Sequence, residues 1–139
     1  MGDFERMHYR SGMLLTADEF ATEQTYHVER RRLLNRMLHG AGIVSGLEVT
    51  GGPDDGAVTV SPGFALDARG REILICEPEH VTVPTGDGAI SVYAMYAEVE
   101  TERSTIRETY TLDASPTPPD DAVVLGIVAG DGTIAPPPA

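Results

Sequence analysis

Five side chains could ligate a transition metal: His8, His27, His39, Cys76 and His80. Metal sites need such ligands at set spacings, such as Cys-x-x-Cys or two histidines four residues apart on a helix. No two of the histidines are four residues apart, and the single cysteine forms no Cys-x-x-Cys pattern. We therefore expect no metal or other cofactor, with the histidines at the surface and Cys76 packing as a small apolar residue. One alternative stays open, in which His27 from several copies of the chain forms a polar layer that holds an ion.

Residues for covalent or acid–base catalysis are also lacking. Ser45, Ser61 and Ser91 are not in a Gly-x-Ser-x-Gly nucleophile elbow, and no histidine–acid pair can be assigned to them. The glycines in residues 40–46 leave a predicted helix and enter a predicted strand, whereas phosphate-binding loops run from strand to helix. The sequence therefore predicts a protein that is not an enzyme.

Two pairs of adjacent acids, Asp54-Asp55 and Asp120-Asp121, lie in predicted turns. Adjacent carboxylates on a loop point apart, and neither pair has the alternating Asp-x-Asp-x-Asp-Gly order of a calcium loop. We interpret them as turn-forming and solubilising residues. Weak calcium binding is the alternative.

Arginines dominate the charge of the predicted helix, at Arg30, Arg31, Arg32 and Arg36. Consecutive helical residues are about 100° apart, so these side chains fan around the helix and cannot all face one phosphate groove. The simple interpretation is a solvated surface whose aliphatic stems cover the core. The sharper hypothesis is that the guanidinium groups bind carboxylates of the acidic second part of the chain, in the same or a neighbouring subunit. Salt should then weaken an assembly.

The chain has 139 residues and no lysine, with ten arginines against 22 acids and a net charge of −12. Residues 1–40 contain six arginines and six acids, so the whole excess lies in residues 41–139. So acidic a chain repels phosphate backbones and anionic lipids, and we expect no nucleic-acid or membrane partner. A single cysteine forms no internal disulfide, and no basic-then-apolar leader is visible, which favours cytoplasmic synthesis.

The sequence predicts a helix over residues 17–39, which contains His27 and the four arginines named above. Thr16 and Glu19 form a capping-box pattern at its start, and Gly40 is a left-handed stop at its end. Steps of four and three residues then define one heptad-like stripe. The stripe consists of Phe20, Gln24, His27, Arg31, Leu34 and Leu38.

The stripe is apolar only at its ends, so two uses of the helix are considered. The C-terminal half is expected to pack on a sheet through Leu33, Leu34, Met37 and Leu38. The N-terminal half is either solvated or meets copies of itself, with Gln24 and His27 as polar layers. We assign the partner interface to the stripe together with Arg30 and Arg32.

Residues 41–135 are rich in Val, Ile, Tyr and Thr, divided by Gly, Asp and Pro turns. The fold class is therefore α+β, with one long N-terminal helix followed by a mainly antiparallel β-sandwich or small barrel. We expect a single domain over 1–139: an arm and helix in 1–40, a β domain in 41–135 and a proline-rich tail in 136–139. Gly40, Gly42, Gly63 and Gly70 are assigned to structural turns. The predicted strands are 47–50, 57–61, 64–67, 71–76, 81–83, 90–100, 109–112 and 123–128.

Six stretches of the chain form one pattern: residues 12–20 (GMLLTADEF), 23–26 (EQxY), 30–32 (RRR), 35–47 (NRxLHGxGIVSGL), 58–73 (VTVSPGFALDARGREI) and 121–128 (DAVVLGIV). Together they resemble a group of phage-tail-like structural proteins that accompany the baseplates and tail fibres of contractile tails and extracellular contractile injection systems. The helix-to-glycine portion is the more specific part, and the β pieces are generic to tail-fibre domains.

This resemblance implies a non-catalytic component that oligomerises, often as a trimer, and attaches fibre or accessory parts at a baseplate. Its partners would be itself and other tail or baseplate proteins, assembled into a virion-like or injection particle. Fibre proteins of this kind commonly carry long distal receptor-binding regions, which these stretches do not include. Receptor recognition is therefore not expected, and three roles stay open: an adaptor, a truncated fibre base or a spike-proximal plug. The runner-up is a small monomeric ligand- or carbohydrate-binding β-domain.

Overall fold

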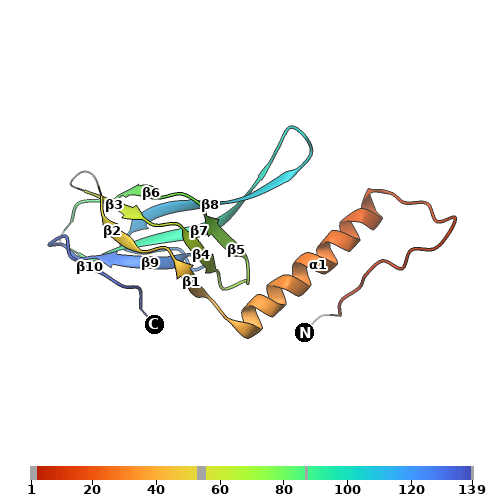
Figure 1. Ribbon diagram of the computed structural model, residues 1–139, viewed down its shortest axis with the longest axis horizontal. Helices are drawn as coiled ribbons and strands as arrows, with labels where there is room; N and C mark the ends of the chain where they lie inside the picture. The colour runs from red at the N-terminus through yellow and green to blue at the C-terminus, as the bar shows by residue number, and fades with distance from the viewer. Residues whose placement is uncertain (1–2, 53–55, 87, 139) are drawn as a thin grey trace.

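The computed structural model describes residues 3–52, 56–86 and 88–138, and shows one helix followed by a mainly antiparallel β body (Figure 1). The predicted α+β class is thus confirmed. The elements are α1 (Ala17–Leu38), β1 (Gly42–Gly46), β2 (Val49–Gly51), β3 (Ala57–Val60), β4 (Gly63–Leu66), β5 (Glu72–Ile75), β6 (Glu79–Thr82), β7 (Ile90–Glu100), β8 (Ile106–Ser115), β9 (Val123–Val128) and β10 (Ile134–Ala135).

Helix α1 begins and ends close to the predicted residues. The capping box forms, and the Glu19 carboxylate accepts a hydrogen bond from the Thr16 amide at 2.8 Å. Gly40 follows with a φ of +81°, and its amide donates to the Asn35 carbonyl at 3.0 Å. This left-handed glycine ends the helix and turns the chain into β1. None of the residues of α1 is fully buried, and in Figure 1 the helix leads away from the β body.

Three bent strands make the first layer of the body. Sheet β1-β4-β5 continues into sheet β2-β3-β6, because the chain passes from β1 to β2, from β3 to β4 and from β5 to β6 across short bends. At the first bend the buried Leu47 has a φ of +56°, and its amide donates to the Pro62 carbonyl. The hydrogen-bond ladder between the strands thus continues through the bend while the strands change direction. Pro62 and Pro78 lie in two of these bends, where the sheet needs no backbone amide donor.

The second layer is the sheet β10-β9-β7-β8. Strand β7 has the bounds that the sequence predicts, residues 90–100, and pairs with β8 on one side and, through residues 90–94, with β9 on the other. The core lies between the layers and takes residues from both: Leu47, Val60, Ile73, Ile75, Val92 and Leu125.

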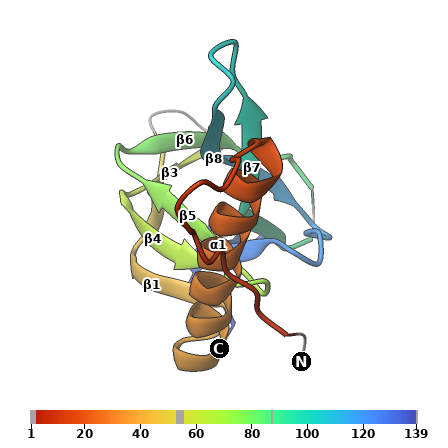
Figure 2. The same ribbon diagram turned by 90° about the vertical axis from the view of Figure 1, so that its right-hand side faces the viewer.

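The β7–β8 hairpin extends past the body. Residues 90–94 of β7 are mostly buried, but residues 98–100 are exposed, and Val99 and Ile106 are 51% and 64% exposed. Figure 2 shows the hairpin projecting beyond the body, with α1 in front of one end of that body. Apolar residues of this hairpin therefore lie on the surface, beyond the part of β7 that the β body covers.

The other strand predictions differ at the edges. Strands β1 and β10 were not predicted, because β1 is glycine-rich and β10 is two residues long. Strand β8 extends past the predicted 109–112 at both ends, because residues 106–108 pair with the projecting part of β7 and residues 113–115 pair with its buried part. In the described part of the chain, no helix has the length and apolarity to cross a membrane.

Candidate assembly interface

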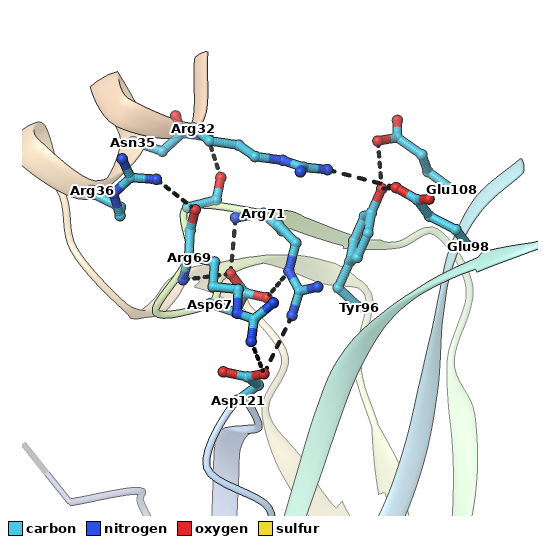
Figure 3. A network of polar contacts seen from close by, with 11 residues as sticks. Arg32, Asn35, Arg36, Asp67, Arg69, Arg71, Tyr96, Glu98, Glu108 and Asp121 are labelled. Carbon is cyan, nitrogen blue, oxygen red and sulfur yellow. Dashed lines mark hydrogen bonds and ion pairs between the residues drawn. The ribbon is translucent and has the colours of Figure 1, made fainter. Parts of the chain in front are cut away.

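Helix α1 contacts the β body through polar side chains. The Asn35 amide donates to the Gly70 carbonyl at 2.9 Å, and the Arg36 guanidinium donates to the Arg69 carbonyl at 2.9 Å. Arg32 reaches Glu98 on β7, with Nη2 3.6 Å from Oε1 (Figure 3). The helix is therefore attached by directional contacts to the β4–β5 turn and to the base of the projecting hairpin.

Gly70 lets the backbone of the turn meet the backbone of the helix. It is buried, has a φ of +79°, and a Cβ at this position would overlap the Arg32 carbonyl oxygen. Only glycine combines this left-handed conformation with so close an approach. The turn at Gly70 that the sequence predicts, residues 67–70, is thus also the part of the β body on which the helix packs.

Asp67 supports that turn from within. It is 1% exposed, and its Oδ1 accepts the amides of Arg69 and Arg71, both at 2.9 Å. Its Oδ2 accepts a hydrogen bond from Arg71 Nε at 2.7 Å. Asp121 adds an ion pair to Arg69 at 3.3 Å and one to Arg71 at 3.9 Å. One acid of the second predicted pair is therefore structural, whereas Asp54 and Asp55 lie outside the described residues.

Tyr96 on β7 links the helix to this cluster (Figure 3). The guanidinium carbons of Arg32 and Arg71 lie 5.6 Å and 5.0 Å from its ring centroid, within range of a cation–π interaction. Its hydroxyl lies 2.6 Å from Glu108 and 2.9 Å from Glu98, which are paired across the two strands. Burial, followed by these two carboxylates, raises the pKa of Tyr96, so the phenol stays protonated at neutral pH.

Arg31 forms a two-point ion pair with Glu72 on β5. Its Nη2 donates to Oε2 at 2.6 Å and its Nε donates to Oε1. The Arg31 side chain is 70% exposed all the same, and the Glu72 side chain is 26% exposed. Together with Arg32–Glu98, this pair confirms within one chain that helix arginines bind carboxylates of the β segment.

The N-terminal arm, residues 3–16, contacts another side of α1. The Arg30 guanidinium carbon lies 5.1 Å from the Phe4 ring centroid. Burial and the neighbouring Glu23 carboxylate raise the pKa of Tyr9. Arg30 and Arg32, both predicted to lie in the interface, thus face the arm and the β body respectively.

The predicted apolar contact of the helix with a sheet is wrong. Leu34, Met37 and Leu38 are 56%, 69% and 79% exposed, and only Leu33 is half-buried. The side of the helix that faces the body carries Arg32, Asn35 and Arg36 instead. The apolar residues of the C-terminal half are therefore left on the surface.

All six residues of the predicted stripe are exposed. Phe20, Leu34 and Leu38 are 53%, 56% and 79% exposed, and Gln24, His27 and Arg31 between them are exposed as well. They are separated by four, three, four, three and four residues, the spacing of a coiled-coil seam. Contacts with the arm and the β body involve other side chains, except at Arg31, so the stripe is an uncovered ridge along the helix.

The candidate metal ligands are not brought together. Among the described residues, no three His, Cys, Asp or Glu side chains form a group that could hold a metal ion. His8, His27, His39, His80 and Cys76 are all exposed. His80 Nδ1 lies 3.1 Å from the Thr59 hydroxyl, and His39 Nδ1 lies 2.8 Å from the Gly40 carbonyl.

Of the assigned glycines, Gly40 and Gly70 turn the chain as predicted. Gly42 opens β1 with a φ of +140°, and Gly63 lies in β4, where a Cβ would overlap the Ser45 carbonyl of the paired strand. Sequence reasoning missed Asn35, Asp67 and Tyr96 as parts of the helix attachment. The turn pattern at Asp67 was the one available signal, because the other two act only through contacts distant in sequence.

Comparison with known proteins adds no assignment: no protein-family model matches the chain, and the curated proteins include no significant match.

Proposed function

We propose that this protein is a non-catalytic structural component of a phage-tail-like contractile particle. It self-associates through the stripe of α1, as a homotrimer, and attaches fibre or accessory parts at the baseplate. Synthesis is cytoplasmic and the product is incorporated into the particle. The β body and the projecting hairpin are the parts available to other tail proteins.

One observation carries the proposal: the heptad-spaced stripe is exposed along a helix that points away from its own β body (Figure 1). Three large apolar side chains, Phe20, Leu34 and Leu38, lie in solvent on that ridge. Apolar surface in such a line is stabilised when it is buried against another chain. The polar contacts of Arg32, Asn35 and Arg36 attach the helix to the β body, and any ordering they provide reduces the entropy lost on association.

The resemblance stated above supports the identity of the particle. Its more specific part covers the capping box, the glycine exit of the helix and four of the six stripe residues, Phe20, Gln24, Arg31 and Leu38. These are the residues that build the exposed helix and its attachment, rather than residues of a catalytic site. The resemblance therefore indicates the class of assembly in which such an exposed helix would function.

The runner-up, a monomeric ligand- or carbohydrate-binding domain, is less well supported. A depression of about 410 Å³ lies between the loops at one end of the β body. Its described lining is mainly glycine, alanine, valine and proline, with Thr85 as the one side chain that can donate a hydrogen bond. Sugar sites need aromatic platforms and several polar side chains, which this described lining does not provide.

A pair of matched leucine variants tests the proposal. Leu34 on the stripe and Leu74 on β5 are 56% and 59% exposed, so both changes remove similar exposed apolar area. We expect Leu34→Ser to shift the protein to monomer in light scattering, whereas Leu74→Ser keeps the wild-type mass. Both variants should keep the wild-type circular dichroism. If the two variants had equal masses, the stripe would not be part of the interface.

The particle assignment has its own test. The tagged full-length protein, expressed with the contractile-particle genes of its host, should co-sediment with intact particles, and Leu34→Ser should not. Particles that assemble normally and never contain the wild-type protein would contradict the assignment while leaving self-association unaffected.

A further inference from the structure

We propose that the α1 helices associate in parallel and in register, and that Glu72 makes this possible by neutralising a layer of Arg31 side chains. The inference rests on the proposed self-association and specifies its partner: a second copy of this chain in one orientation. It also assigns Glu72, a residue of the β body, a role in positioning and neutralising Arg31 at the helix interface.

The order of side chains along the stripe selects the orientation. In a parallel, in-register arrangement each layer contains identical residues, so Phe20, Leu34 and Leu38 meet their own copies and Gln24 and His27 meet theirs. In an antiparallel arrangement centred on the stripe, Gln24 faces Leu34 and His27 faces Arg31. The Gln24 amide would then be buried against Leu34 without a hydrogen-bonding partner, which is unfavourable. The parallel arrangement avoids this mismatch.

Parallel association raises one difficulty, because it brings the Arg31 side chains of all copies close together. Like charges at this separation repel, and more strongly once water is excluded. The structure supplies the compensation, since both nitrogens of the Arg31 fork are bound by the two oxygens of Glu72. Each copy therefore brings a neutral pair to the layer, and the planar two-point geometry leaves the other guanidinium edge free of the carboxylate.

The source of the carboxylate explains how the helix and the β body work together. Glu72 is in β5, directly after the turn that seats the helix, and the Asn35 amide donates to its Oε1 at 3.3 Å. Glu72 is therefore held beside Arg31 by the same contacts that attach α1. A free α1 peptide would lack the carboxylate, so association in register depends on the folded β body.

Cysteine cross-linking in the full-length chain tests the orientation. In a Cys76→Ser background, Gln24→Cys and Leu34→Cys are each oxidised alone and as an equal mixture. Parallel packing predicts disulfide-linked dimers from each variant alone. Dimers from the mixture only would overturn the parallel arrangement and leave self-association intact. Absence of cross-linking in all three samples, together with a monomeric mass, would overturn both.

Charge variants test the role of Glu72. We expect Glu72→Gln to weaken association at least about tenfold at low salt, with the loss shrinking as salt screens the arginine layer. Glu77→Gln removes the same charge from an exposed glutamate elsewhere on the β body and should leave association unchanged. Arg31→Leu in the Glu72→Gln background should restore association. Equal effects of the two glutamate variants, or no rescue, would overturn the role assigned to Glu72.

Discussion

The attachment of the helix depends on a few residues that act through geometry rather than through buried area. Gly70 accepts the Asn35 side chain at its carbonyl and leaves room for the Arg32 backbone. Asp67 fixes the turn on which Gly70 lies by accepting three hydrogen bonds from a nearly inaccessible position. Loss of either residue therefore changes the direction of α1 as well as the stability of the turn.

Gly70→Ala is the sharpest test at this scale. The new Cβ would meet the Arg32 carbonyl, and alanine is strained at a φ of +79°. We expect a loss of about 2–3 kcal/mol in the free energy of unfolding by urea. Gly86→Ala is the control, because nothing lies within 4 Å of its Cβ position, and it should change stability by less than about 0.5 kcal/mol. Similar losses for both variants would show that the turn is not a close contact.

A polar contact between β8 and β6 joins the two layers of the β body. Tyr110 on β8 donates a hydrogen bond from its hydroxyl to Glu79 on β6 at 2.7 Å. Burial, and next this hydrogen bond, raise the pKa of Tyr110 to about 12 from the ordinary value of 10. The folded state thus holds the phenolic proton more tightly than the unfolded state does.

This pKa shift predicts a loss of stability in alkali. Because the folded pKa is the higher one, the stabilisation is complete below pH 10 and is lost as the pH rises from 10 to about 12. Urea unfolding at pH 9 and pH 11.5 should show a smaller alkaline loss for Tyr110→Phe than for the wild type. Parallel losses in the two proteins would mean that Tyr110 does not contribute.

The sequence predicted the elements better than their contacts. Local signals were sufficient for α1, since its cap and its glycine stop depend on residues within one turn of each end. The alternation of β-branched residues located most strands, but glycine-rich β1 and short β10 carry too little of that pattern. The heptad spacing of the stripe also follows from the sequence alone, and its use as an interface stays a prediction.

The packing of α1 was predicted wrongly for a physical reason. Leu33, Leu34, Met37 and Leu38 suggested an apolar face against a sheet, yet the body offers Glu72, Glu98 and the Gly70 carbonyl to the helix. Polar contacts between residues far apart in the chain produce no periodic pattern in a single sequence. The arginine–carboxylate hypothesis did anticipate them, because it followed from the uneven charge of the two halves.

At the scale of the whole molecule, the effect of salt on association is expected to be the reverse of the one inferred from the sequence. The arginines of α1 that pair with carboxylates do so within their own chain, so salt does not compete with bridges between subunits there. Each chain carries a net charge of −12, and screening reduces the repulsion between β bodies. Association measured by sedimentation should therefore be stronger at about 0.5 M than at about 0.05 M salt. Weaker association at high salt would point to ion pairs across the interface.

We propose that the exposed stripe of α1 becomes buried only when copies of the chain meet. Light scattering coupled to size-exclusion chromatography measures this association, with the whole chain over a range of concentrations at both salt levels. A homotrimer has a mass three times that of the 14.9 kDa chain. A mass of one chain at every concentration and both salt levels would contradict the proposal.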